Sequence, residues 1–164
     1  GSTKLSEAIQ TPYVFYSDSY GWFGGASYWH LWNAAADGFE TSVRDYEVVK
    51  TIYDPSPVGY TVPASGAFAS FDAANTAKGP SETSGFRNFR FYCSAVHDDR
   101  TILFRAVGQR SGSGRGEGMG QETRYWTAVP ATGTRAQVFH LTDRAEMQTT
   151  DLSGALPVRP VREK

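Results

Sequence analysis

Apolar and polar residues alternate with a period of two in one segment of the chain, and short apolar runs lie on both sides of it. In 86–93, one set of alternate positions is mostly apolar and the other mostly polar, which is typical of a half-buried β-strand. Runs of β-branched and aromatic residues predict further strands. These runs are 13–16, 48–53, 60–63, 101–107, 125–128, 137–141, 146–150 and an extended piece at 157–161. We expect 146–150 to pair with 137–141 as a hairpin.

Residues that favour tight turns separate these runs. In 54–59, two prolines fix the backbone, Asp54 can cap it, and Gly59 supplies conformational freedom, so the sequence predicts a turn there. Further turns are expected at 97–100 and at 143–144.

Helix is predicted at only one place. Phe68 and Phe71 lie three residues apart and indicate one or two helical turns within 64–71. The small, polar stretch 73–85 is predicted to be a loop, and the six glycines of 108–120 predict a flexible surface loop. Short strands, long loops and little helix together predict an α+β domain built on a mixed or antiparallel sheet.

Length and composition fit this prediction. The chain has 164 residues, which suits a single domain at 3–164, and the first two residues resemble a cloning scar. Aromatic residues make up 14% of the chain and there are 17 glycines, which favours strands and irregular loops over a helix bundle. Lys plus Arg number 16 and Asp plus Glu 17, so we expect no affinity for nucleic acid or for an anionic membrane. No run approaches the roughly 20 apolar residues of a membrane span.

No arrangement of reactive residues indicates catalysis or a cofactor. The histidines are scattered without a second ligand at a metal-binding spacing, so no metal site is predicted at His30, His97 or His140. Asp98 and Asp99 fit a solvated turn better than a calcium site. Cys93 lies within a strand pattern without His and Asn partners in a recognisable order, and it is predicted to be a buried structural thiol. We therefore expect a protein that is not an enzyme.

Four large aromatic residues gather in a loop-rich part of the chain, namely Trp22, Phe23, Trp29 and Trp32. They could form a platform that stacks against sugar rings or grips a partner. Burial against the core is the favoured interpretation, because large aromatic side chains are usually well buried. Trp126 lies within a predicted strand and is expected in the core.

Several segments resemble, in the same order, the signature of the Fibrobacter succinogenes major paralogous domain family. The family occurs widely in surface proteins and lipoproteins of Bacteroidetes. The similar segments are 50–63 (KTIYDPSPVGYTVP), 101–110 (TILFRAVGQR), 124–128 (RYWTA) and 154–163 (GALPVRPVRE). The upstream segments 8–16 (AIQTPYVFY) and 31–33 (LWN) resemble versions found in gut Bacteroides proteins.

The resemblance implies a C-type-lectin-like core, related also to the fold of formylglycine-generating enzymes. It implies an exported, lipid-anchored protein at the outer-membrane or extracellular surface. Some similar domains are the variable proteins of diversity-generating retroelements, which implies recognition and adhesion rather than chemistry. The expected partner is a glycan or a protein on another cell or in the host environment.

Two departures from the family pattern are informative. Many relatives carry Cys where this chain has Ser56 and again where it has Pro160, which is how the loss of a disulfide pair would look. This hypothesis predicts that Ser56 and Pro160 lie within the roughly 7 Å Cα separation that a disulfide can bridge. The chain also lacks an upstream segment that relatives usually have, so we expect it to be the C-terminal part of a larger surface protein or a shortened variant.

The leading hypothesis is a binding domain whose loops carry recognition. The expected ligand surface is built from 109–121, 130–136 and 143–150, because Arg and Tyr supply contact area and directional hydrogen bonds. Its candidate residues are Arg110, Arg115, Tyr125, Arg135 and Arg144, with Trp22 from the aromatic group. Two alternatives stay open: a structural subunit of a pilus or surface assembly, which would present an apolar interface or a donated strand, and a protein related to formylglycine-generating enzymes, which would need a reactive cysteine in an open cleft.

Overall fold

The computed structural model describes residues 30–97 and 99–163, together with 7, 10, 11, 13, 14 and 16. Trp22, Phe23, Trp29 and Asp98 lie outside the described residues. The predicted strand at 13–16 lies partly outside them, and Tyr13 and Val14, which are described, belong to a turn and a bend.

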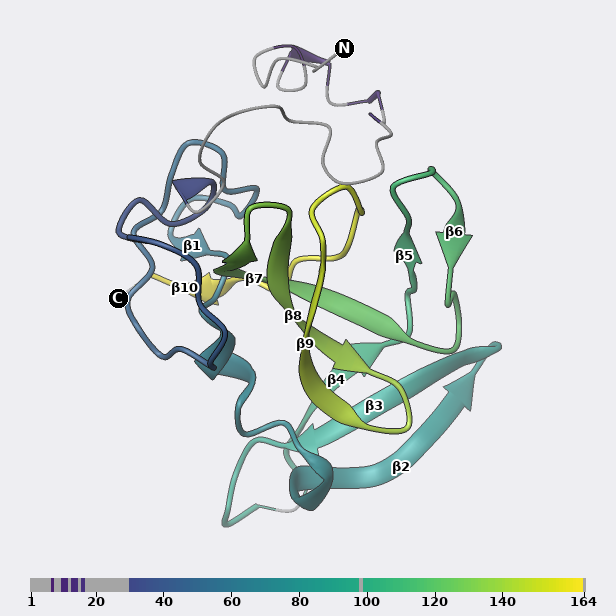
Figure 1. Cartoon of the computed structure of the whole chain (residues 1–164). Helices are drawn as coiled ribbons and strands as arrows, with labels where there is room; N and C mark the ends of the chain where they lie inside the picture. Colours follow the sequence, from purple (N-terminus) through teal and green to yellow (C-terminus); the bar gives the residue numbers. More distant parts are fainter. Residues whose placement is uncertain are drawn as a thin grey trace.

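A three-stranded antiparallel sheet forms the centre of the molecule (Figure 1). It consists of β7 (Thr123–Thr132), β8 (Arg135–Leu141) and β9 (Ala145–Asp151), joined by two short turns. The first two strands are buried along nearly their whole length, whereas β9, at the edge, alternates between exposed and partly buried positions. The predicted strands at 125–128 and 137–141 and the hairpin with 146–150 are confirmed, as is the turn at 143–144.

A second antiparallel sheet lies below the first in Figure 1. It contains β2 (Thr76–Thr83), β3 (Phe86–Tyr92) and β4 (Thr101–Arg105), in that order. Phe89 and Phe91 in β3 point into the core, which confirms the half-buried strand that the alternation predicts. The strand predicted at 101–107 is confirmed with a slightly earlier end.

Two small two-stranded sheets complete the fold. In one, β1 (Tyr60–Thr61) pairs with β10 (Val161–Arg162), so the middle of the chain meets its C-terminal part. In the other, β5 (Gln109–Arg110) and β6 (Gly116–Glu117) form a hairpin. Two short 3-10 helices lie between β1 and β2, at η2 (Ser65–Phe68) and η3 (Ala73–Asn75). The predicted helical turn within 64–71 is therefore confirmed.

The central sheet has an apolar cluster on each of its faces. Side chains of β7 and β8 meet aromatic residues of the second sheet and of η2 on one face, in a cluster formed by Phe68, Phe89, Phe91, Phe104, Ala106, Tyr125, Phe139 and Leu141. On the other face, Val62, Trp126, Ala128, Ala136 and Val138 form a second cluster. Trp32 packs edge-on against Trp126 with the ring centroids 5.6 Å apart, so the described tryptophan of the aromatic group joins the core, as expected.

The turn at 54–59 is confirmed with the roles predicted for its residues. Asp54 Oδ1 accepts a hydrogen bond from the Ser56 N–H at 2.7 Å, and Gly59 adopts a positive φ of 79°. Asp54 Oδ2 accepts bonds from the Thr61 hydroxyl and the Val62 N–H, both at 2.9 Å. One buried carboxylate thus fixes the turn to the strand that follows it.

The strand predicted at 48–53 is wrong. This segment forms one isolated antiparallel β-bridge, between Lys50 and Asn33, instead of a strand. Ile52 is almost fully exposed. The Asn33 side chain accepts a hydrogen bond from the Val49 N–H at 2.9 Å. A buried amide side chain therefore takes the place of the neighbouring strand that the β-branched residues suggested.

Two stretches predicted to be loops contain strands. The stretch 73–85 forms η3 and β2, an edge strand that pairs with β3 through an irregular register, so it needs no regular apolar alternation. The glycine-rich stretch 108–120 contains the β5–β6 hairpin, and four of its six glycines have positive φ. These glycines serve turn geometry.

Cys93 is exposed just beyond the end of β3, so the prediction of a buried thiol is wrong as well. Together these elements make a loop-rich, mostly β domain with very little helix.

Candidate functional site

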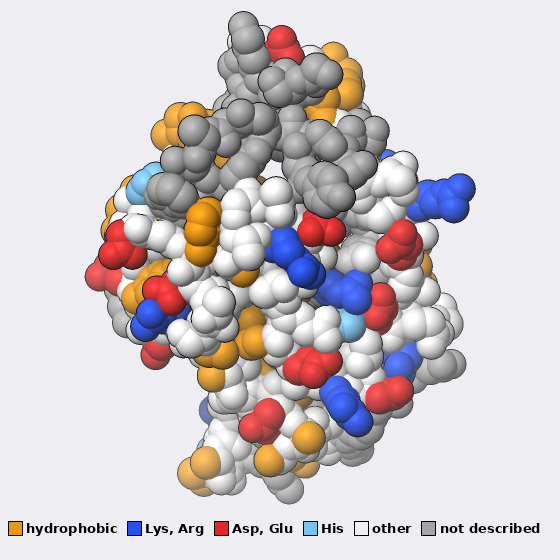
Figure 2. Space-filling view, viewed as in Figure 1, with side chains coloured by type: hydrophobic (Ala, Val, Ile, Leu, Met, Phe, Trp, Pro, Cys, Tyr) orange, Lys and Arg blue, Asp and Glu red, His pale blue; other side chains and the backbone are white. Residues whose placement is uncertain are grey.

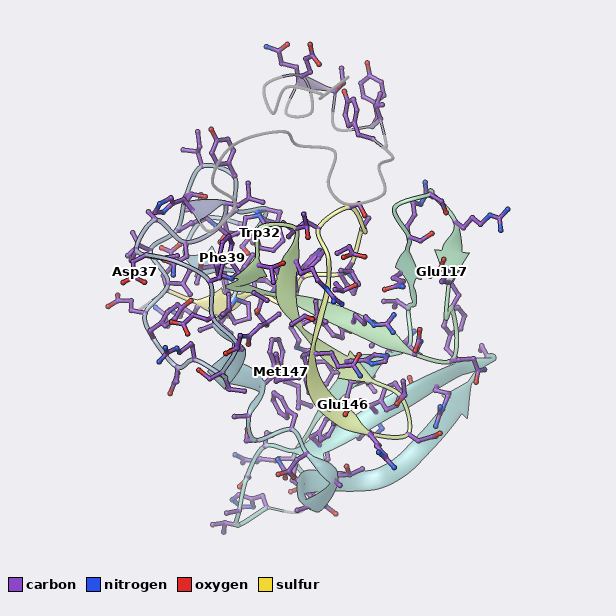
Figure 3. The ribbon with its side chains drawn as sticks, in the orientation of Figure 1. Trp32, Asp37, Phe39, Glu117, Glu146 and Met147 are labelled. Carbon is purple, nitrogen blue, oxygen red and sulfur yellow. The ribbon has the colours of Figure 1, made fainter. Side chains whose placement is uncertain are left out.

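A polar cleft of about 610 Å³ lies between the β5–β6 hairpin and the turn that follows β9. We call it the hairpin cleft. Its lining carries hydroxyl, amide, carboxylate and guanidinium groups together with glycine backbone, from Gln109, Arg110, Ser111, Gly112, Ser113, Glu117, Thr150, Asp151, Ser153 and Gly154. The hairpin that carries Glu117 stands beside the segment after β9 in Figures 1 and 3. The lining offers many directional hydrogen-bonding groups.

The hairpin wall of the cleft is fixed at its base by backbone contacts. The Gly108 N–H donates to the carbonyl of Glu122 at 2.9 Å, and the Glu122 N–H donates to the carbonyl of Gly118 at 2.9 Å. Both glycines have positive φ, and a Cβ at Gly108 would stand 2.5 Å from the Glu117 carbonyl oxygen. Only glycine fits where the backbone at residue 108 passes the Glu117 carbonyl, so this glycine fixes the position of the hairpin base.

The opposite wall is joined to the hairpin by backbone hydrogen bonds. Arg110 and Ala155 exchange two backbone hydrogen bonds, at 2.9 and 2.8 Å. Asp151, at the end of β9, lies 3.6 Å from the Arg135 Nε. Gln109 donates to the Glu117 carboxylate at 3.1 Å across the hairpin. The cleft therefore has two ordered walls and carboxylates on both of them.

The structure brings together parts of two of the three segments expected to carry recognition. Residues from 109–121 and from the end of 143–150 line the hairpin cleft. Arg110 lies in its lining, and Arg115 is exposed at the tip of the same hairpin. Arg135 is exposed at the start of β8, where it donates to the Thr149 carbonyl at 2.8 Å.

Two other candidate residues lie elsewhere. Arg144 is exposed on the β8–β9 turn, where it borders a second groove of about 600 Å³ beside Phe89 and Leu141. Tyr125 cannot belong to a ligand surface, because it is 7% exposed and packs edge-on against Phe104 in the core. Burial raises the pKa of its hydroxyl. Trp22 lies outside the described residues.

Sequence reasoning missed a network of polar side chains on the central sheet. His140 is paired in register with Arg124 on β7 and Glu146 on β9, so the three side chains share one face. The His140 Nε2 lies 2.9 Å from Glu122 Oε2, and its Nδ1 lies 3.0 Å from Gln148 Oε1. The sequence did carry a signal for this network, namely the alternation of polar residues at 122 and 124 and again at 146 and 148. The signal could be interpreted only once the register of the paired strands was known.

A histidine beside a carboxylate can serve as a catalytic pair when its second nitrogen faces a substrate. Here both ring nitrogens of His140 contact protein groups, and the side chain is only 8% exposed. This geometry suits a structural role for His140.

Charge is spread evenly over the surface around these features. Figure 2 shows acidic and basic side chains interspersed on this face, in keeping with the net charge of −1. Within the described ranges, no cluster of three or more His, Cys, Asp or Glu side chains is placed to hold a metal ion. The helices in the described part of the chain are too short or too polar to cross a membrane.

Comparison with known proteins gave no match to a family model, a curated protein or a solved structure.

Proposed function

We propose that this chain is a non-catalytic recognition domain of the cell surface, with a C-type-lectin-like core, which binds a glycan or protein ligand in the hairpin cleft. The observation that carries the proposal is the cleft itself. Its volume of about 610 Å³ lies in the ordinary range for ligand sites, and its lining is rich in groups that form directional hydrogen bonds.

The position of the cleft supports the same function. Its walls come from a turn-rich hairpin and a loop, held by a sheet that is buried on both faces. Recognition residues commonly lie on loops that a rigid scaffold positions. The resemblance of several sequence segments, in the same order, to the Fibrobacter succinogenes major paralogous domain family supports a location at the cell surface.

A binding screen with a cleft-blocking variant tests this proposal. The protein is applied to glycan and surface-protein arrays, and each positive spot is tested again with Ser113→Trp, which places a bulky ring in the lining of the cleft. Thr41→Trp is the matched control, because Thr41 is exposed and lies outside the cleft lining. We expect Ser113→Trp to abolish binding and Thr41→Trp to preserve it. Binding that survives Ser113→Trp would place the ligand elsewhere, and self-assembly without any binding would favour a structural subunit.

A further inference from the structure

His140 lies between the amide oxygen of Gln148 and the carboxylate of Glu122, and both of these groups accept hydrogen bonds. The Gln148 Nε2 donates to Glu146 Oε1 at 2.7 Å, so the amide oxygen of Gln148 faces His140. The opposite amide orientation would set that oxygen against the Glu146 carboxylate. The His140 Nδ1 must therefore carry a proton in order to bond Gln148.

The second ring nitrogen faces a carboxylate. Glu122 Oε2 lies 2.9 Å from the His140 Nε2, and its other oxygen accepts from Arg124 Nη1 at 3.2 Å. An ionised carboxylate only accepts hydrogen bonds, so the Nε2 must donate as well. This arrangement, in which both ring nitrogens donate, requires a protonated ring.

The charges around His140 agree with a protonated ring. The charged groups that face it are Glu122 from the segment before β7, Arg124 from β7 and Glu146 from β9. With a cationic ring the four groups sum to zero. A neutral ring would leave one excess negative charge among these groups, and a lone pair of a side chain that is only 8% exposed would point at an oxygen.

The same network joins the two walls of the hairpin cleft. Glu122 holds the base of the β5–β6 hairpin through its backbone bonds to Gly108 and Gly118. On the other side, Gln148 lies two residues before Thr150, which lines the cleft from β9. A continuous chain of hydrogen bonds thus runs from the hairpin through His140 to β9.

We propose that His140 is a proton-dependent clamp that holds the two walls of the hairpin cleft in their binding arrangement. This inference rests on the function proposed above, because it makes that cleft sensitive to pH. When the ring loses its proton, one of its two hydrogen bonds is lost, so the side-chain link between Glu122 at the hairpin base and Gln148 on β9 is broken, while the backbone bonds between Arg110 and Ala155 remain. We expect binding in the cleft to be stronger at about pH 5.5 than at about pH 8.0.

Hydrogen exchange of the protein alone tests the clamp without any ligand. Exchange rates at about pH 5.5 and 8.0 are divided by the intrinsic rates at each pH, for wild type, His140→Gln and His97→Gln. His97 is exposed and serves as the matched histidine control. In wild type and His97→Gln, we expect the Gly108 and Glu122 amides to be roughly tenfold better protected at the lower pH, the order expected for one charge-assisted hydrogen bond. The buried Ala128 amide should not change.

Two results overturn the clamp: equal protection of these amides at both pH values in wild type, or the same pH dependence in His140→Gln. If His140→Gln fails to fold, nitrogen NMR of the wild-type imidazole decides. Protons on both His140 ring nitrogens at about pH 5.5, with loss of one at 8.0, support the clamp. A single protonated nitrogen at the lower pH overturns it.

The array screen, run at both pH values, separates failure of the clamp from failure of the proposed function. Binding that weakens at about pH 8.0 in wild type, but not in His140→Gln, supports both proposals. Cleft binding that is independent of pH overturns the clamp alone. The absence of binding at either pH overturns the proposed function, while the exchange experiment still decides the clamp.

Discussion

The rings of Phe68 and Phe139 stack almost parallel, with centroids 4.7 Å apart and planes inclined by 10°. Phe68 belongs to the short helix η2, and Phe139 lies in the middle of β8. Phe71 and Phe104 lie beside the pair, at centroid distances of 5.8 to 6.5 Å from its two rings. A single helical turn is therefore fixed to the central sheet by aromatic packing, and it closes one side of the core.

Replacement of Phe68 with Ala removes the ring that anchors η2. Because Phe68 is 4% exposed, we expect a loss of about 3–5 kcal/mol in the free energy of unfolding, from lost burial and an unfilled cavity. Phe86→Ala is the control, since Phe86 is 38% exposed and should cost less than about 1 kcal/mol. Urea denaturation followed by tryptophan fluorescence measures both. Equal losses for the two variants would mean that η2 does not contribute to the core.

Local spacing was enough to predict η2 and β3, because their apolar residues point to one side in the pattern that each backbone imposes. The same reasoning failed for the segment 48–53. Its β-branched residues have strand propensity, but the side chain of Asn33, some 16 residues away, satisfies the Val49 N–H in place of a strand. Tertiary contacts of this kind are invisible to a local pattern.

The candidate site, like the fold, could be predicted only in part from local sequence patterns. Two loop segments expected to carry recognition do meet at the hairpin cleft, but Tyr125 lies in the core, because β7 is buried on both of its faces. Which neighbours the side chains of a strand meet depends on its register, and the register depends on which strands pair. The contact of His140 with Glu122 and Gln148, 18 and 8 residues away, arises only after β7, β8 and β9 have paired.

Asp54 is expected to make stability depend on pH in the acidic range. Burial raises the pKa of its carboxyl, but hydrogen bonds from Val62, Ser56 and Thr61 outweigh burial and hold the pKa below its ordinary value. A carboxyl whose pKa is lower in the folded than in the unfolded chain stabilises the fold at pH values above its unfolded pKa, which is about 3.9. This contribution is lost as the pH falls through the folded pKa. Wild type should therefore lose stability as the pH falls below about 5.

Asp54→Asn tests this contribution directly. The amide can accept only at its oxygen, and its NH₂ group would face N–H donors, so we expect a loss of about 2 kcal/mol at neutral pH. The variant should also lose less stability than wild type on acidification. Asp37→Asn is the control, because Asp37 is exposed in Figure 3 and lacks these partners. A steeper acid dependence in Asp54→Asn than in wild type would contradict the assignment.

Three glycine variants should form a graded series, measured by urea denaturation. Gly38 has open space where a Cβ would stand, so Gly38→Ala should be neutral or slightly stabilising. Gly85 also has space but a φ of 78°, so Gly85→Ala should cost about 1–2 kcal/mol from backbone strain. Gly108 combines a φ of 70° with a blocked Cβ position, so Gly108→Ala should cost more than either. An unaffected Gly108→Ala variant would show that the base of the hairpin is not fixed as described.

The segments that carry Ser56 and Pro160 lie against each other. Thr61 pairs with Val161, so the next pair in that register is Val62 with Pro160, and the Glu163 N–H donates to the Gly59 carbonyl at 3.0 Å. The Asp54 carboxylate accepts from both the Ser56 and the Val62 N–H groups. Ser56 is therefore joined through one carboxylate to the residue opposite Pro160. This arrangement agrees with the hypothesis of a lost disulfide, which stays a prediction.

Restoring both cysteines tests that hypothesis. In a Cys93→Ser background, which removes the competing exposed thiol, Ser56→Cys combined with Pro160→Cys should form a disulfide on mild oxidation. The bond would close a loop of about a hundred residues, and we expect roughly 2–4 kcal/mol of added stability through the restricted unfolded chain. Intact mass without reductant and the shift in denaturation midpoint measure the two effects, with Ser56→Cys alone as the control. Two free thiols in the oxidised, folded double variant would separate these positions in space and remove the lost-disulfide interpretation.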